Sequence, residues 1–178
     1  MDKVLFFAHK IIKEHINSDS ICIDATMGNG NDTLFLAQIS KKVYAFDIQE
    51  VAINKTKELC KDYDNITYIL DSHENINKYV NENVQAIIFN LGYLPGGNKE
   101  ITTKASVVLK AIDVSLSKLD KNGVIVITLY PGCESGLKES KALEEYLNNL
   151  NQKEFEVVKY QFINQKNNPP YLLIIERI

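Results

Sequence analysis

The sequence has no tryptophan, three cysteines, four prolines and a single arginine, Arg177, among its 20 basic residues. Cys22, Cys60 and Cys133 are odd in number and far apart, which excludes a disulfide framework and a CxxC metal clamp. We therefore expect a reducing, cytoplasmic setting and no metal. A single arginine cannot make several bidentate contacts with phosphate or guanine, so contacts with nucleic acid must come from other residues.

Long apolar runs are absent too, since none approaches the roughly 20 residues that a membrane helix needs. Met1-Asp2-Lys3 leads into an amphipathic segment and not into the apolar core of a signal peptide. The net charge of −3 excludes non-specific binding of nucleic acid, although it is compatible with a structured RNA partner. We expect the 178 residues to form one domain, 1–178, with no membrane partner.

Helical and strand patterns alternate along the chain. Strands are expected at 20–26, 42–48, 66–70, 84–90, 123–130, 155–163 and 171–178, and helices at 2–16, 31–40, 50–62, 73–81, 102–119 and 137–150. The strands are apolar on both faces, which indicates a parallel sheet covered by helices on each side. Residues 164–170 are too few for a right-handed crossover, so the last two strands must be antiparallel. The prediction is an α/β fold with a doubly wound, mostly parallel seven-stranded sheet and an antiparallel last strand, Rossmann-like and typical of class I methyltransferases.

A glycine-containing loop follows the first strand in the segment DATMGNGNDT, residues 24–33. Gly28 and Gly30 permit backbone angles closed to other residues and let a ligand approach the main chain. Asp47 ends the second strand, nineteen residues after Gly28. An acid at this position accepts hydrogen bonds from both hydroxyls of a ribose, which NAD and S-adenosylmethionine (SAM) both carry.

The neighbouring residues favour SAM over NAD. A dinucleotide site needs a third small residue so that the helix N-terminus can receive pyrophosphate, whereas this chain has Thr33 directly after Asp32. Asp32 and Asp24 oppose a diphosphate and suit the amino group of a methionine moiety. Two structural alternatives remain, because Asp32 could be a helix N-cap and Asp24 could be a strand-end residue satisfied by loop amides.

The third strand ends at Asp71-Ser72-His73, where this fold usually contacts adenine. A carboxylate or hydroxyl can hold the exocyclic amine, and an imidazole can lie against the ring, but Asp71 or Ser72 could equally cap the next helix. His9 and His15 are expected to serve only a helix face. The expected cofactor contacts are Asp24, Thr26, Gly28, Asn29, Gly30, Asp32, Thr33, Asp47, Ile48, Gln49, Asp71, Ser72, His73 and Asn90.

Two tetrapeptides headed by asparagine compete for the catalytic position. Asn168-Pro169-Pro170-Tyr171 has the composition found in enzymes that methylate exocyclic or amide nitrogens, but it lies in the predicted terminal hairpin, where proline simply shapes a connection. Asn90-Leu91-Gly92-Tyr93 ends the fourth strand, where that motif belongs in this fold. We therefore predict Asn90, Leu91 and Tyr93 as catalytic, with the Asn90 side-chain oxygen and the Leu91 carbonyl accepting hydrogen bonds from a target amine.

The loop at 164–170 leaves the ligand-binding edge of the sheet and is expected to line the substrate entrance. Lysines there and after the fourth strand are candidates for phosphate contacts. The expected substrate contacts are Tyr93, Pro95, Lys99, Lys104, Tyr130, Lys166 and Asn167.

Four segments, DATMGNGNDTLFLA, AFDIQ, FNLGYLPGGNK with ITTK, and YQFINQKNNPP, together resemble the YtqB-like rRNA methylase family, whose members include MnmM-type tRNA methyltransferases. The resemblance implies SAM-dependent methylation of the amine of 5-aminomethyl-2-thiouridine at the tRNA wobble position. It thus implies tRNA as the partner. Where many relatives have Tyr-x-Gly-His after the fifth strand, this chain has Tyr130-Pro131-Gly132-Cys133, so its proton acceptor must be another group or water.

Several alternatives stay open on the sequence. The substrate could be rRNA or another RNA base, and Cys133 could act as the nucleophile of a C5 methylation, although nothing nearby in the sequence obviously lowers its pKa. The chain could also be a SAM- or RNA-binding module without turnover, or an NAD-linked oxidoreductase. The sequence leaves a homodimer open as well.

Overall fold

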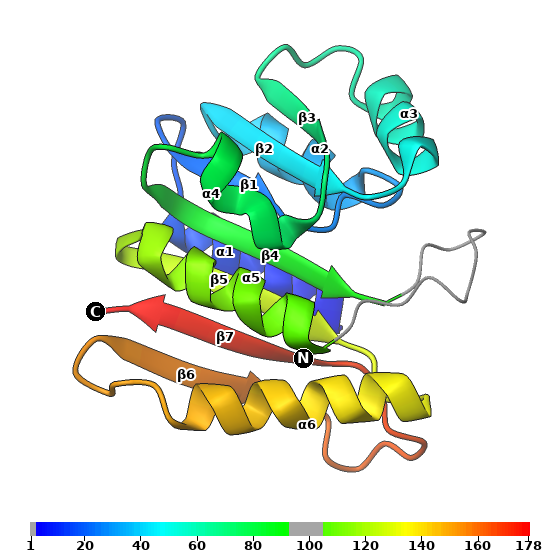
Figure 1. The fold of residues 1–178 in the computed structure, drawn as a ribbon, viewed down its shortest axis with the longest axis vertical. Coiled ribbons are helices and arrows are strands. Elements are labelled where there is room, and N and C mark those ends of the chain that lie inside the picture. The colour runs from blue at the N-terminus through cyan, green and yellow to red at the C-terminus, as the bar shows by residue number, and fades with distance from the viewer. Residues whose placement is uncertain (1–2, 93–104) are drawn as a thin grey trace.

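Seven strands form one sheet in the computed structural model, which describes residues 3–92 and 105–178. The strands are β1 (Ile21–Asp24), β2 (Lys42–Asp47), β3 (Ile66–Leu70), β4 (Val84–Leu91), β5 (Leu119–Leu129), β6 (Phe155–Tyr160) and β7 (Tyr171–Arg177). Their order across the sheet is β3-β2-β1-β4-β5-β7-β6 (Figure 1). β7 pairs antiparallel with both β5 and β6, while the other pairs are parallel. The predicted fold class, including the antiparallel last strand, is confirmed.

Helices alternate with the strands as predicted. They are α1 (Val4–His15), α2 (Asn31–Ile39), α3 (Glu50–Leu59), the 3-10 helix η1 (His73–Asn75), α4 (Ile76–Tyr79), α5 (Ala105–Lys118) and α6 (Glu134–Asn148). Within the described residues, no helix has the length and apolar content needed to cross a membrane.

Several element boundaries differ from the prediction by a few residues, and the following three differences are the most informative. The segment expected as one helix at 73–81 divides into η1 and the single turn of α4. Helix α6 begins at Glu134 instead of 137, because the Cys133 sulfur caps it by accepting the Gly136 N–H at 3.4 Å. Strand β5 begins at Leu119, which pairs with Val84 before the register shifts, and Asn122 within that irregular stretch has φ 61°.

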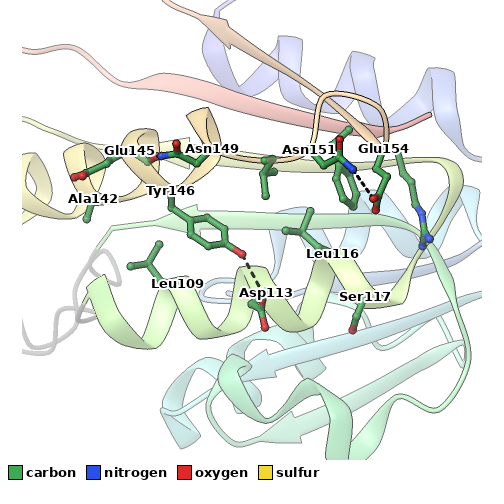
Figure 2. Close-up of a pocket in the computed structure, with 13 residues that line it drawn as sticks. Leu109, Asp113, Leu116, Ser117, Ala142, Glu145, Tyr146, Asn149, Asn151 and Glu154 are labelled. Atoms are coloured by element: carbon green, nitrogen blue, oxygen red, sulfur yellow. Dashed lines mark hydrogen bonds between the residues drawn. The ribbon is translucent and has the colours of Figure 1, made fainter.

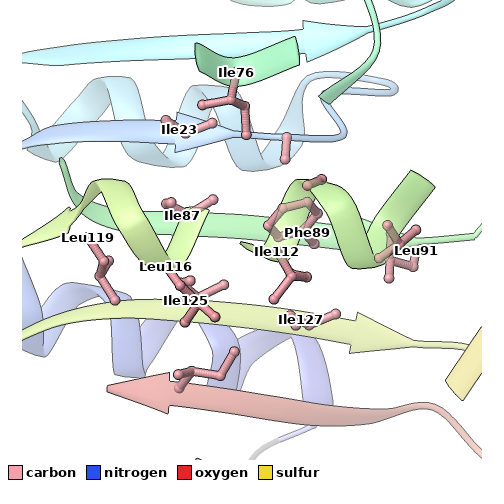
Figure 3. Packing of buried hydrophobic residues seen from close by; sticks show 14 of the residues in the cluster. Ile23, Ile76, Ile87, Phe89, Leu91, Ile112, Leu116, Leu119, Ile125 and Ile127 are labelled. Atoms are coloured by element: carbon pink, nitrogen blue, oxygen red, sulfur yellow. The ribbon is translucent and has the colours of Figure 1, made fainter. Parts of the chain in front are cut away.

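Both faces of the sheet are covered, which explains why its strands are apolar on both sides. Helices α4, α5 and α6 pack on one face and α1, α2 and α3 on the other. Figure 3 shows Ile87 and Phe89 of β4 and Ile125 of β5 packed beneath Ile112 of α5. Each such fully buried side chain stabilises the fold by about 1.5–3 kcal/mol relative to exposure.

The direction in which successive strands are added to the sheet reverses between β1 and β4. From β1 the chain moves outward to β2 and β3, and it then returns to β4 on the other side. In open α/β sheets, ligands bind at the carboxyl ends of the strands beside such a reversal. Asp24, Asp47 and Asn90 lie at or next to the carboxyl ends of β1, β2 and β4, so the topology gathers them at one edge.

Candidate active site

The loop between β1 and α2 is folded tightly by its two glycines. Gly28 and Gly30 have φ of 50° and 87°, in the left-handed region that other residues avoid. A Cβ atom on Gly30 would lie 2.9 Å from the Thr56 side chain of α3. The Met27 N–H donates to the Phe46 carbonyl at 2.9 Å, which ties the loop to the end of β2. Position 30 therefore requires glycine for both its backbone angle and its close packing, and position 28 favours it for the backbone angle.

Asp47 lies beside this loop with part of its hydrogen-bonding capacity free. Its Oδ2 accepts the Gly28 N–H at 3.0 Å, and its Oδ1 accepts the Gln49 N–H at 2.9 Å. A carboxylate offers about four acceptor positions, so roughly two remain for the hydroxyls of a ribose. This arrangement agrees with the role predicted for Asp47.

Asp24 is placed differently from the prediction that it faces the cofactor. Its side chain is fully buried, with one oxygen accepting the Thr26 N–H at 3.1 Å and the other accepting the Thr33 hydroxyl at 2.6 Å. Burial, followed by repulsion from Asp32, raises the pKa of Asp24 to about 7. The structure favours the alternative in which Asp24 is a strand-end residue satisfied by a loop amide, that of Thr26, and adds the Thr33 hydroxyl as a second partner.

Asp32 lies in the first turn of α2, and the cap residue of that helix is Gly30, so Asp32 is not a helix N-cap. Its Oδ1 is 2.7 Å from His9 Nε2, and its Oδ2 accepts from the Asn90 side-chain amide at 3.4 Å. The expectation that His9 serves only a helix face is therefore wrong. The sequence did not indicate this contact, because helix α1 and the end of the β1–α2 loop come together only in the folded chain.

Asp71-Ser72-His73 is engaged in local contacts. Ser72 caps η1 by accepting the Glu74 N–H at 3.4 Å, so the capping alternative holds for it. Hydrogen bonds from Asn75 and Tyr79 satisfy the Asp71 carboxylate and help to lower its pKa. His73 is only 8% exposed, with Nδ1 3.0 Å from the Ala25 carbonyl. Little of the imidazole is therefore exposed to lie against an adenine ring, and a cofactor contact by His73 stays a prediction.

Asn90 is held at the end of β4 through both its backbone and its side chain. The Asn90 N–H donates to the Thr26 hydroxyl at 2.7 Å. Its side chain contacts Asp32 and the hydroxyl of Tyr130, whose pKa is raised by burial and by the nearby Asp32. Leu91 still belongs to β4, and its side chain is buried in the core. Only its main chain can serve a ligand, in keeping with the predicted carbonyl role.

The remaining residues predicted to contact cofactor or substrate lie on several different segments of the chain. Asn29 accepts from the Lys55 ammonium at 3.4 Å, and Ile48 is 59% exposed beside Asp47. Lys166 and Asn167 are exposed in the β6–β7 loop. Four predicted residues lie outside the described part of the chain: Tyr93, Pro95, Lys99 and Lys104.

Cys133 is exposed after β5, and the structure corrects one expectation about it. Hydrogen bonds from the Ser135 hydroxyl and the Gly136 N–H lower the pKa of its thiol. The sequence had suggested no neighbour that would do so. The cause is local, since both groups belong to the first turn of α6.

A separate groove of about 870 Å³ lies between α5 and α6. Figure 2 shows Tyr146 donating to Asp113 across it, at a distance of 3.1 Å. Its lining includes Leu109, Glu154 and Arg177, and none of its residues belongs to the strand-end loops described above. The groove is therefore distinct from the candidate active site.

The chemistry of the strand-end site fits SAM. Asp32 and Asp47 present acidic groups at the edge, and repulsion from both adds to the effect of burial in raising the pKa of Asp24. Such a cluster suits the cationic sulfonium and amino groups of SAM and opposes a pyrophosphate. Among the described residues, no group of three or more His, Cys, Asp and Glu side chains is arranged to hold a metal ion.

Comparisons with known proteins agree with this geometry. The family model described as "Putative rRNA methylase" matches residues 43–176. A chloroplastic "tRNA (mnm(5)s(2)U34)-methyltransferase" of Arabidopsis thaliana is 32% identical, over 96% of this chain and 68% of that protein. A "putative methyltransferase" of Streptococcus mutans, crystallised with S-adenosylhomocysteine (SAH), is 43% identical, with a TM-score of 0.95 over 100% of this chain and 99% of that chain. A Streptococcus thermophilus rRNA methylase is 40% identical, with a TM-score of 0.88 over 100% and 98%.

Proposed function

This chain belongs to the "Putative rRNA methylase" family and is a SAM-dependent methyltransferase, and we propose that it methylates an alkyl amine on tRNA. The target is the aminomethyl group of 5-aminomethyl-2-thiouridine at the wobble position. The placement of Asn90 is the observation that carries this proposal, because its amide lies at the end of β4 beside the cofactor loop. The name of the Arabidopsis relative supports the same nucleoside and position.

The residues around the β1–α2 loop would hold SAM, which supplies a methyl group on a positively charged sulfur. Asp47 would accept the ribose hydroxyls, and the main chain at Gly28 and Gly30 would let the cofactor approach closely. Asp32 would favour the cationic end. Asp24 and Thr33 would act indirectly, because their contacts with each other and with Thr26 fix the loop.

Asn90 would hold and aim the amine. Its side-chain oxygen and the Leu91 carbonyl would accept hydrogen bonds from the nitrogen, which leaves the nitrogen lone pair directed at the methyl carbon. The amine must be neutral, since an alkylammonium has no lone pair. The proton that the ammonium loses before transfer would pass to water or to a nearby acceptor, so activity is expected to rise with pH.

RNA contacts would come from the loops at the same edge of the sheet. Lys166 and Asn167 are exposed in the β6–β7 loop, and the Asn168 carbonyl oxygen would lie 3.9 Å from a Cβ atom on Gly132, so this loop adjoins the one after β5. Tyr130 lies between that region and Asn90. Three free cysteines suit a reducing compartment, which supports a cytoplasmic location for the reaction.

A second candidate is methylation of a pyrimidine carbon in rRNA or tRNA, with Cys133 as nucleophile. The lowered pKa of its thiol favours this candidate, as does the rRNA methylase description of the family. Under this mechanism Cys133→Ala should reduce the rate by about a thousandfold or more. Under amine methylation the same variant should retain nearly all of its turnover.

Nucleoside mass spectrometry of tRNA and rRNA from a strain that lacks this gene tests the proposal directly. We expect 5-aminomethyl-2-thiouridine to accumulate in tRNA, and its methylated form to return when the gene is restored. Restoration with Asn90→Ala should leave the unmethylated nucleoside in place. Loss of a methylated rRNA base, with tRNA unchanged, would reject the proposed substrate.

A further inference from the structure

His9 is fixed against the cofactor loop by two different contacts. Its ring stacks on Phe35 of α2, with centroids 3.9 Å apart and planes 1° from parallel. Its Nε2 lies 2.7 Å from Asp32 Oδ1. Stacking fixes the plane of the ring, and the hydrogen bond fixes its rotation within that plane. His9 therefore holds one oxygen of Asp32 in a defined place.

The other oxygen of the same carboxylate faces the catalytic asparagine. Asp32 Oδ2 lies 3.4 Å from Asn90 Nδ2, longer than the usual range of about 2.7–3.2 Å, but strengthened by the carboxylate charge. The Asn90 N–H is already fixed by the Thr26 hydroxyl. The backbone is thus set, and the remaining freedom of Asn90 is the rotation of its side chain, which Asp32 and Tyr130 contact.

An asparagine amide presents a donor on one side and an acceptor on the other. A carboxylate at Nδ2 therefore determines that Oδ1 faces away from Asp32. A target amine needs an acceptor, so an inverted Asn90 amide would present the wrong group to it. The orientation of Asp32 consequently matters to the reaction even though Asp32 need not touch the amine.

We propose that His9 is a positioning residue for methyl transfer, which fixes Asp32 and through it orients the Asn90 amide with its oxygen toward the target amine. This inference rests on the proposed function, since it assigns the Asn90 oxygen to an amine substrate. It extends the site to helix α1 and adds a residue that acts through Asp32.

Two variants separate the hydrogen bond from the packing. His9→Phe keeps a ring that can stack on Phe35 and removes the contact with Asp32, whereas His9→Gln offers a side-chain N–H near the position of Nε2 and removes the stack. We expect His9→Phe to lower kcat by roughly tenfold to a hundredfold, because small misplacements of reacting groups have effects of that order. His9→Gln should recover most of that loss, although its packing is poorer. His15→Phe is the matched control on the same helix and should keep kcat within about twofold of wild type.

The variants are compared by steady-state kinetics on tRNA from a strain that lacks this gene, which carries the unmethylated aminomethyl nucleoside, by calorimetry of SAM binding, and by thermal denaturation. The proposal requires a loss in kcat for His9→Phe without a comparable loss in SAM affinity or Tm, and rescue by Gln. Equal activity in His9→Phe and wild type would overturn it. So would parallel losses of activity, SAM binding and Tm in both variants, because His9 would then be a packing residue only.

A readout without substrate keeps this test independent of the proposed function. In protein labelled with ¹⁵N-asparagine, the Asn90 side-chain amide signal, assigned by its loss in Asn90→Asp, should shift in His9→Phe and return toward wild type in His9→Gln. If the signal behaves so while tRNA is not methylated, the substrate proposal fails and the positioning contact stands. An unmoved signal in His9→Phe rejects the positioning role, whatever the substrate.

Discussion

Two tetrapeptides have similar composition, but the asparagines that begin them have very different surroundings, one in the central strand β4 and the other in the loop between β6 and β7 at the edge of the sheet. Asn90 is half-buried, and its backbone or side chain contacts Thr26, Asp32 and Tyr130. Asn168 is exposed in the β6–β7 loop, with φ 49°. The strand end at which a tetrapeptide lies therefore indicates its role better than its resemblance to a known motif does.

The tyrosine that ends the second tetrapeptide is fixed by structural contacts. Tyr171 begins β7, is only 4% exposed, and donates its hydroxyl to Glu144 of α6 at 2.6 Å. Burial raises its pKa, with a further rise from Glu144. A side chain packed in this way has no face left for a target base. The Asn168-Pro169-Pro170-Tyr171 segment is thus a structural connection, and its prolines shape the hairpin.

Replacement of Asn90 should have the largest effect of any change at these two sites. Asn90→Ala removes an acceptor that acts on the reacting nitrogen, and we expect kcat to fall by about a hundredfold to a thousandfold, roughly 3–4 kcal/mol. The Kd of SAM should change much less. Asn83→Ala, directly before the other end of the same strand and exposed, is the matched control. Single-turnover kinetics would contradict the assignment if both variants transferred methyl groups at the wild-type rate.

Asp47→Asn tests whether the Asn90 edge also holds the cofactor. The carboxylate has about two acceptor positions beyond its contacts with Gly28 and Gln49, and charge-assisted hydrogen bonds contribute about 1.5–3 kcal/mol each. We expect the Kd of SAM to rise by roughly tenfold or more, with kcat at saturating SAM close to wild type. Calorimetry on Asp62→Asn, an exposed carboxylate after α3, supplies the control. Equal affinities for all three proteins would remove Asp47 from the cofactor site.

Asp24→Asn should stabilise the cofactor-free protein at high pH. The folded protein retains the Asp24 proton up to a pKa of about 7, whereas the unfolded chain loses it around the ordinary value of 3.8, so the free energy of unfolding falls as pH rises from 3.8 toward 7. Asparagine cannot ionise and can keep both loop contacts. We expect its Tm to exceed that of wild type by about 3–6 °C at pH 8, with a smaller difference at pH 5. A gain that is independent of pH would contradict this cause.

Asn168→Ala should have the smallest effect. Its side chain belongs to an exposed loop, so we expect kcat near wild type and a change in the KM for RNA of less than about threefold. The measurement is steady-state kinetics beside Asn90→Ala. If Asn168→Ala abolished transfer in a folded, SAM-binding protein while Asn90→Ala remained active, the two regions would have to exchange their assigned roles.

The sequence by itself determined the alternation of elements, the antiparallel last strand, and the placement of Gly28, Gly30, Asp47 and Asn90 at strand ends. These features follow from local signals, because apolar periodicity, glycine and the length of a connection act within a few residues. The same signals fixed the parallel sheet, since apolar strands separated by helices leave few other ways to bury both faces.

Only the tertiary structure decided which polar groups meet. Asp24 was assigned to the cofactor but is satisfied by Thr26 and Thr33 inside the loop, and His9 was assigned to a helix surface but contacts Asp32. The sequence separation between His9 and Asp32 is 23 residues, and between Asp32 and Asn90 it is 58. No periodicity encodes such contacts, because hydrogen bonds act over about 3 Å and depend on how α1, α2 and β4 pack against one another. The types of side chain at the site could therefore be predicted from the sequence, whereas the contacts between those side chains were established only by the fold.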